Sequence, residues 1–218
     1  MEPQELVTLQ TFIIDGWAVQ SKLEQIEAEV LTSQLFTSVK TMKKVAFRGG
    51  SLALVSMVAL FPHAQTLYDL DIRKFEHHAE HSESQDGERY LKLLAGRFTR
   101  LTDLTVELPH LQPCPKLNIW CSYLAKSRNL RRLLIIGPAV SFGYGKRPKY
   151  VQMSFKFVQH LMNILLKIKE GIPIQELRYR RPHHIGDLEV IGRWHGIMIG
   201  GRPVFDCEEA NRWKYGYY

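Results

Sequence analysis

Residues 130–137 read Leu-Arg-Arg-Leu-Leu-Ile-Ile-Gly, and the spacing of their apolar residues recurs along the chain. Leu130, Leu133 and Ile135 form an apolar-x-x-apolar-x-apolar frame that has six copies in all. The middle residues of the copies are Phe12, Val45, Leu70, Leu104, Leu133 and Leu177, so successive copies lie 33, 25, 34, 29 and 44 residues apart. In an extended chain the last two apolar residues of each copy point to the same side. Each copy therefore predicts a short, half-buried strand.

Helical patterns separate the predicted strands. They are predicted at about residues 18–33, 51–61, 90–98, 117–126 and 151–170. In the first of these, Val19, Leu23, Ile26 and Val30 are spaced as one face of a helix. A strand and a helix that recur every few tens of residues are typical of a repeat array. We therefore expect an α/β solenoid over residues 1–184, with a short parallel strand plus a helix in each of about six repeats.

The frame is lost after Arg181. Residues 185–218 instead carry Trp194, Trp213 and a Gly-Gly pair at 200–201. The end of a repeat array exposes an apolar face that requires an atypical cap, and we expect residues 185–218 to form it. Residues 76–88 and 137–149 are polar or glycine-rich, and both stretches predict exposed loops.

Composition bounds the class of protein. The chain has 218 residues and 45% hydrophobic residues, which is enough for one buried core. It contains no run of 18 apolar residues, so we expect no membrane span and no membrane partner. The acidic start of the chain does not resemble a secretory signal. Three scattered cysteines do not form a disulfide framework, and they favour an intracellular location, in the cytoplasm or the nucleus.

The net charge of +7 is unevenly distributed. Residues 1–109 carry 11 Lys/Arg against 15 Asp/Glu, whereas residues 110–218 carry 18 against 7. A basic C-terminal half attracts an acidic partner. Two other interpretations stay open: the charge only keeps the surface solvated, or the basic half binds nucleic acid, with Tyr and Trp stacking on bases.

The repeated frame resembles that of leucine-rich repeats. Polar residues lead into it, as in Arg128-Asn129-Leu130 and Gln65-Thr66-Leu67. The variable spacing and the stretch FPHAQTLYDLDI at 61–72 look most like the irregular repeats that follow F-box motifs in fungal and plant proteins. The resemblance covers about residues 6–181. It implies a substrate-recognition part of an F-box-type ubiquitin-ligase adaptor, although the first forty residues show no F-box pattern.

Three segments invite a catalytic or metal-binding interpretation. His77, His78 and His81 have helical ligand spacing, but their polar surroundings favour a solvated loop. Gly143-Tyr144-Gly145-Lys146 follows a strand, yet it lacks the earlier glycine and the Ser/Thr of a phosphate-binding loop. Cys114, between two prolines, has no base nearby to activate it. We therefore expect a non-enzyme without cofactor or metal.

The predicted binding surface is the sheet face that lies opposite the helices. Two rows of side chains are expected to point outward there: Ile13, Ala46, Asp71, Thr105, Leu134 and Arg178, and then Asp15, Arg48, Arg73, Glu107, Ile136 and Arg180. Arginine forks suit carboxylate ligands. The candidate partner-binding residues are Arg48, Arg73, Arg131, Arg132, Lys146, Arg147, Arg178 and Arg180. We expect a protein-protein interaction module that binds an acidic segment of another protein or ubiquitin-ligase adaptor subunits, with nucleic-acid binding as the alternative.

Overall fold

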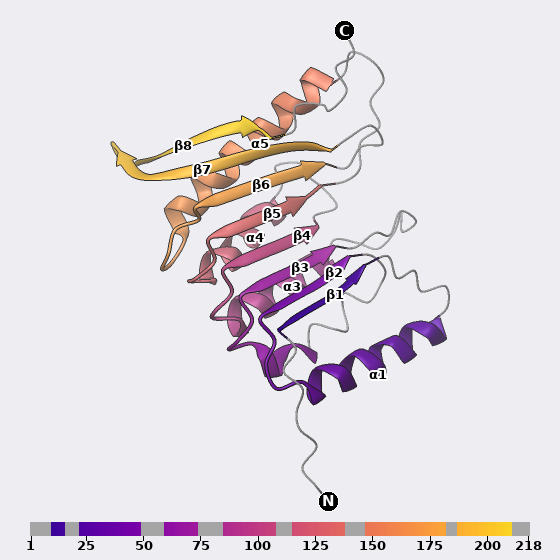
Figure 1. The fold of residues 1–218 in the computed structure, drawn as a ribbon. Coiled ribbons are helices and arrows are strands. Elements are labelled where there is room, and N and C mark those ends of the chain that lie inside the picture. Colours follow the sequence, from indigo (N-terminus) through magenta and orange to yellow (C-terminus); the bar gives the residue numbers. More distant parts are fainter. Residues whose placement is uncertain are drawn as a thin grey trace, which may run out of the picture.

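The computed structural model describes residues 10–15, 22–48, 59–73, 85–107, 115–137, 147–181 and 187–210 (Figure 1). The elements in this part of the chain are β1 (Thr11–Asp15), α1 (Lys22–Ser38), β2 (Lys44–Arg48), the 3-10 helix η1 (Phe61–His63), β3 (Asp69–Arg73), α3 (Gln85–Arg97), β4 (Asp103–Glu107), α4 (Pro115–Lys126), β5 (Arg132–Ile136), α5 (Arg147–Ile168), β6 (Glu176–Arg181), β7 (Leu188–Ile199) and β8 (Arg202–Glu209).

The strands form one eight-stranded sheet in the order in which they occur in the chain, from β1 to β8. Strands β1 to β6 are parallel, and the middle residues of the six frame copies pair in register from Phe12 to Leu177. The frame thus marks strand positions correctly, because the last two apolar residues of a copy face one side of the sheet.

The expected solenoid of strand-plus-helix repeats is wrong. β7 pairs antiparallel with β6, and β8 pairs antiparallel with β7, so the sheet is mixed. The β7–β8 connection is the tight turn at Gly200-Gly201, which leaves no room for a crossover helix. Such hairpin strands need no helical return, unlike parallel strands. Residues 188–209, predicted as part of a separate cap, extend the sheet itself.

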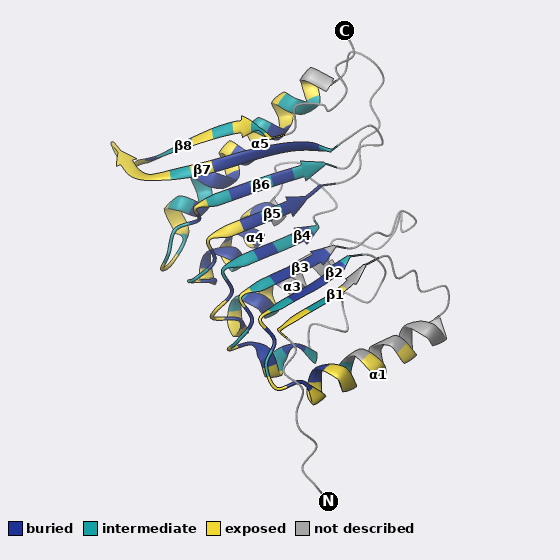
Figure 2. Ribbon diagram, in the orientation of Figure 1, coloured by how far each residue is buried: buried dark blue, intermediate teal, exposed yellow. Residues whose placement is uncertain are grey.

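The four helices of the described residues lie toward one face of the sheet or at its β1 end, and α3, α4 and α5 cover that face (Figure 1). The core lies between this layer and the sheet, where Leu104, Leu133 and Leu177 are 2% exposed or less. Figure 2 shows buried residues along the middle strands of the sheet and exposed residues at the turn between β7 and β8. Burial of such side chains is the main favourable term in the fold.

Helix boundaries depart from the sequence predictions at three places. α1 begins and ends about four residues later than predicted, and its Val30 is half exposed instead of buried. α3 starts at Gln85, inside the predicted loop 76–88. α5 starts at Arg147, before the predicted position, and Pro148 lies in its first turn, where the missing N–H of proline is tolerated.

The contact between α5 and the antiparallel strands depends on a glycine. Gly192 pairs with Leu177 on β6, at the position where an apolar frame residue would otherwise stand. A Cβ atom there would lie 2.8 Å from Val158 Cγ1 and 3.2 Å from Met162 Cγ. The missing side chain therefore lets α5 approach β7 closely. Within the described residues, no helix has the length and apolar character needed to cross a membrane.

Candidate functional site

The sheet face opposite the helices, here called the open face, carries three rows of side chains in register. The first row runs from Thr11 through Lys44, Asp69, Asp103, Arg132, Glu176 and Arg193 to Asp206. The second row holds Ile13, Ala46, Asp71, Thr105, Leu134, Arg178, Ile191 and Glu208. The third row holds Arg48 on β2 and, further along the sheet, Glu107, Ile136, Arg180 and Glu189.

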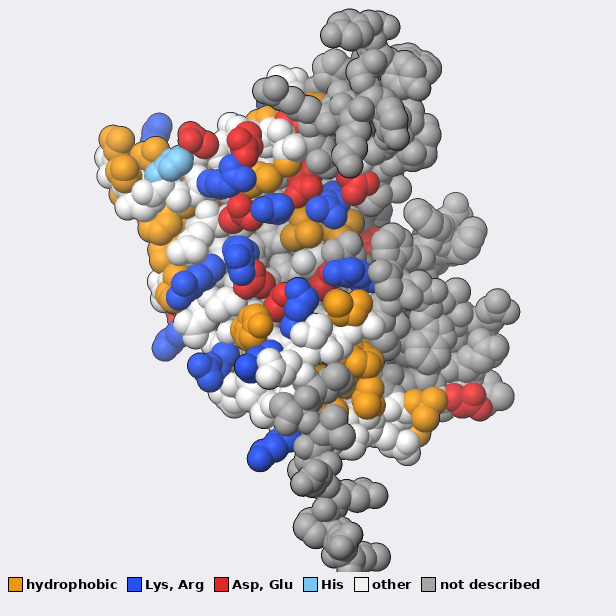
Figure 3. Space-filling view, viewed as in Figure 1, with side chains coloured by type: hydrophobic (Ala, Val, Ile, Leu, Met, Phe, Trp, Pro, Cys, Tyr) orange, Lys and Arg blue, Asp and Glu red, His pale blue; other side chains and the backbone are white. Residues whose placement is uncertain are grey.

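Positive and negative side chains alternate across the open face (Figure 3). Lys44 Nζ lies 2.5 Å from Asp69 Oδ2 on the next strand, and Arg48 Nε lies 3.0 Å from Asp71 Oδ2. Arg132 on β5 pairs with Asp103 on β4. Lys44 and Asp69 are register partners on neighbouring strands, as are Asp103 and Arg132, whereas Arg48 reaches diagonally to Asp71. Both arrangements bring opposite charges together across strands.

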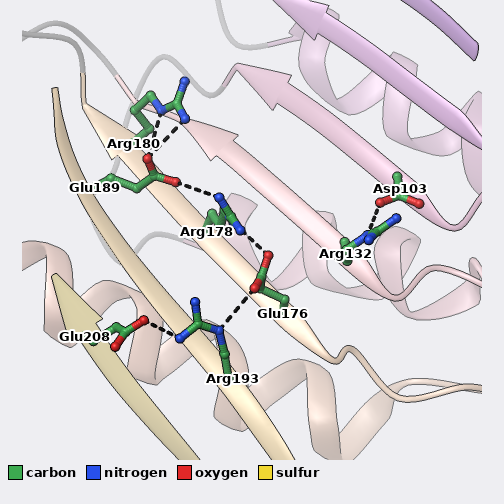
Figure 4. Close-up of polar contacts among 8 residues, drawn as sticks. All are labelled: Asp103, Arg132, Glu176, Arg178, Arg180, Glu189, Arg193 and Glu208. Atoms are coloured by element: carbon green, nitrogen blue, oxygen red, sulfur yellow. Dashed lines mark hydrogen bonds and ion pairs between the residues drawn. The ribbon is translucent and has the colours of Figure 1, made fainter. Parts of the chain in front are cut away.

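The pairs merge into a network where the sheet becomes antiparallel (Figure 4). Arg178 Nε donates to Glu176 Oε1 at 2.7 Å, and Arg193 Nε donates to Glu176 Oε2 at 3.2 Å. Arg180 Nη2 donates to Glu189 Oε2 at 3.1 Å, while Arg178 Nη1 lies 3.6 Å from Glu189 Oε1. Arg193 also pairs with Glu208 on β8. The network thus joins three strands.

Both carboxylates at the centre of the network have arginine partners. Glu189 is only 3% exposed, and a buried carboxylate is stable only when it is paired. Burial alone would raise the pKa of Glu176, but hydrogen bonds and charges from Arg178 and Arg193 outweigh burial and lower that pKa. Glu176 therefore stays ionised at neutral pH.

The middle of the open face is less polar than its ends. Thr105 and Leu134 are half-buried in the second row, and Ile136 is buried in the third. Asp71, which pairs with Arg48, is 4% exposed. The open face is therefore an apolar centre framed by balanced charges, which resembles the composition of protein-binding surfaces.

The five loops that run into β2, β3, β4, β5 and β6 form a second surface, here called the leading edge. They comprise residues 39–43, 64–68, 98–102, 127–131 and 169–175. Each loop is tied to the one before it by a carbonyl that accepts two consecutive backbone N–H groups. Gln10 O accepts from Lys43 and Lys44 at 3.1 and 3.0 Å, and Thr102 O accepts from Arg131 and Arg132 at 2.8 and 3.0 Å. This seam of hydrogen bonds continues the sheet into its loops.

Side chains reinforce the seam. Asn129 Nδ2 donates to Thr99 O at 2.6 Å, and Thr99 Oγ1 donates to Gln65 Oε1 at 3.0 Å. Lys169 Nζ, after the end of α5, donates to the carbonyls of Ser127 and Arg128 at 2.7 and 3.2 Å. Burial lowers the pKa of Lys169 to about 8. The ammonium group thus adds a second hydrogen bond to carbonyls that already accept from the backbone N–H groups of Leu130 and Ile172.

The structure brings some of the predicted binding residues together. Arg48, Arg132, Arg178 and Arg180 lie on the open face, each beside a carboxylate of this chain. An acidic partner would have to compete with those internal pairs. Arg131 lies on the leading edge, is exposed, and has no ion pair within the described residues. Arg73 pairs in register with Arg48, and Arg147 begins α5. Lys146 lies outside the described residues.

Other residues of interest were not predicted from the sequence. Glu176 and Glu189 neutralise the arginines, but they contact partners on other strands, so no local motif marks them. The β7–β8 turn carries exposed Ile197, Met198 and Ile199. In the sequence this turn is indicated by an apolar triplet between Gly196 and the Gly200-Gly201 pair. A Gly-Gly pair is frequent in hairpin turns.

The segments with catalytic or metal-binding spacing, His77–His81, Gly143–Lys146 and Cys114, lie outside the described residues. Within the described ranges, no cluster of three or more His, Cys, Asp or Glu side chains has a metal-binding arrangement. Burial raises the pKa of the Cys121 and Cys207 thiols to about 11, so neither is an activated nucleophile at neutral pH.

A scan against protein-family models, a search of curated proteins and a search of solved structures each returned no match for this chain.

Proposed function

We propose that the chain is a non-catalytic protein-protein interaction module that binds its partner across the open face of the sheet. The observation that carries the proposal is the charge balance of this face. Each described basic side chain in its three rows lies beside a carboxylate: Lys44, Arg48, Arg132, Arg178, Arg180 and Arg193. A balanced, ordered face around an apolar centre suits a protein surface of mixed polarity.

The same observation speaks against nucleic acid as the partner of the open face. A phosphate backbone is uniformly negative and is bound by unpaired Lys and Arg. On this face a phosphate would meet Asp69, Asp103 and Glu208 together with the arginines. An acidic protein segment, a role as a ubiquitin-ligase adaptor and an intracellular location stay predictions, and the last agrees with the free thiols Cys121 and Cys207.

The test is affinity capture from a cell lysate, with and without nuclease, followed by mass spectrometry. The variant Thr105→Arg/Leu134→Glu places two charges at the apolar centre of the open face. Its matched control, Met153→Arg/Ile119→Glu, places the same two charges at exposed positions on α5 and α4. We expect a stoichiometric protein that survives nuclease, is retained by the control and is lost with the open-face variant.

Two outcomes would contradict the proposal. Equal retention by both variants would mean that the partner binds elsewhere. Capture that collapses on nuclease treatment and falls steeply with added salt would favour nucleic acid, because counterion release sets that salt dependence.

A further inference from the structure

The end of the β7–β8 hairpin is an exposed apolar tip. Ile197, Met198 and Ile199 are 52%, 50% and 67% exposed, and they are consecutive in the chain. Ile197 pairs with Val204 and Ile199 with Arg202, around a turn in which Gly200 and Gly201 have φ of 56° and 74°. Two glycines with positive φ form a tight turn whose backbone twist matches that of the two flanking strands. The tip is therefore a compact apolar end and not a fraying loop.

The tip is apolar on both sides of the hairpin. Side chains alternate along a strand, so Ile197 and Ile199 project to one side and Met198 to the other. Figure 3 shows hydrophobic side chains at the protruding end of the β7–β8 hairpin. A groove on a protein surface would cover one side of such a ribbon and leave the other in water. A lipid layer surrounds an inserted tip from every side.

The leading edge adds positive charge beside the tip. β7 runs antiparallel to β6, so its end returns to the side of the molecule where β6 begins (Figure 1). The five loops of the leading edge contain six basic residues, Lys40, Lys43, Arg100, Arg128, Arg131 and Lys169, and one acidic residue, Glu170. Arg202 adds an exposed cation at the turn itself.

These cations differ from those of the open face. Lys40, Arg100 and Arg131 are exposed, and they form no ion pair within the described residues. The hydrogen-bonded seam holds their loops at fixed positions relative to one another. A rigid basic edge next to an apolar point combines the two attractions that peripheral proteins use, which are apolar insertion and attraction to anionic headgroups.

We propose that the chain binds the surface of an anionic membrane through the β7–β8 tip and the leading edge. Ile197, Met198 and Ile199 insert at the level of the headgroups, and the basic loops lie against the acidic lipids. The sequence expectation of no membrane partner rested on the lack of a long apolar run, which bears on spanning segments and not on surface contact. Because the open face is a different surface, this proposal is independent of the proposed function.

The test is co-sedimentation of the full chain with vesicles. Vesicles of phosphatidylcholine alone are compared with vesicles containing roughly a quarter phosphatidylserine. We expect binding to the anionic vesicles, weaker binding at high salt, and about a tenfold or greater fall in partitioning for Ile197→Ser/Ile199→Ser, since both apolar contacts are lost. The variant Lys43→Glu/Arg131→Glu is expected to lose the preference for phosphatidylserine.

Two controls separate this site from a general effect. Ile119→Ser/Met153→Ser removes two apolar side chains of 40% and 48% exposure from α4 and α5, and it is expected to bind as the unchanged protein does. Thr105→Arg/Leu134→Glu, which tests the open face, is expected to leave vesicle binding intact. Circular dichroism confirms that each variant is folded.

No binding to phosphatidylserine vesicles would overturn the proposal, and so would equal binding by the tip variant and its control. A tip variant that leaves vesicle binding unchanged but loses a captured protein would assign the tip to a protein partner instead. Binding that depends on the tip but not on lipid charge would overturn the role given to the leading edge.

Discussion

The parallel part of the sheet, β1 to β6, and its antiparallel end, where β7 and β8 pair onto β6, are held in register by different means. In the parallel part an apolar frame faces the helices, and the open face has single ion pairs such as Arg132–Asp103. At the antiparallel end a glycine replaces a frame residue, and a charge network joins three strands. The difference shows that strand register within one sheet can depend mainly on burial of apolar residues in one region and on charge pairing between strands in another.

The largest expected effect tests the apolar frame. Leu133→Ala deletes a side chain that is 1% exposed, and we expect it to lower the free energy of unfolding by about 2–5 kcal/mol. Leu134→Ala, one residue along on the open face, is expected to cost about 1 kcal/mol, because Leu134 is only half-buried. Urea unfolding followed by circular dichroism measures both. Equal losses would mean that the two faces of β5 are equally buried.

A second change tests the glycine of the antiparallel end. Gly192→Val forces a side chain against Val158 and Met162, and overpacking of this kind is expected to cost about 1–3 kcal/mol. Gly96→Ala in α3 is the control, since an added Cβ there meets no atom within 4 Å. A helix gains roughly 0.5–1 kcal/mol from that replacement. Thermal unfolding should move the two variants in opposite directions, and a stable Gly192→Val would show that α5 can move away from β7.

The smallest effect separates the charge network from a single pair. Glu189→Gln removes a buried charge that Arg178 and Arg180 share, and we expect a loss of about 1–3 kcal/mol. Asp103→Asn removes the partner of Arg132, whose side chain is 65% exposed, so we expect about 0–1 kcal/mol. Unfolding at low and high salt measures both. If Glu189→Gln cost no more than Asp103→Asn, the network would have no role beyond that of a surface pair.

The same comparison explains which parts of the fold could be predicted from the sequence. Leu104 and Leu133 belong to a recurring pattern, so local spacing was enough to position their strands. Gly192 carries no apolar signal although it faces α5, and the pattern therefore stopped before β7. That gap favoured a separate cap over two further strands, whereas the incorrect solenoid followed from the recurrence of strand and helix before it.

The candidate surfaces were predictable only in part. The outward positions of Arg178 and Arg180 follow from alternation along β6. Their carboxylate partner Glu189 lies on another strand, and its pairing depends on the antiparallel register of β7. Long-range pairing of this kind leaves no trace in local spacing. The exposure of Ile199 was likewise unpredictable, because an apolar triplet in a strand is more often buried.

The hydrogen-bonded seam has a consequence for how this chain can vary in length. Successive frame copies are 25 to 44 residues apart. In every copy after the first, however, two consecutive backbone N–H groups at the start of the strand donate to one carbonyl of the preceding copy. An insertion between the donors of one loop and its strand would separate them from their acceptor and break the seam at that point. An added turn in α4 or α5 would not disturb the seam. The leading edge thus fixes where each strand begins, and differences in length between the frame copies are confined to the segments that connect its loops.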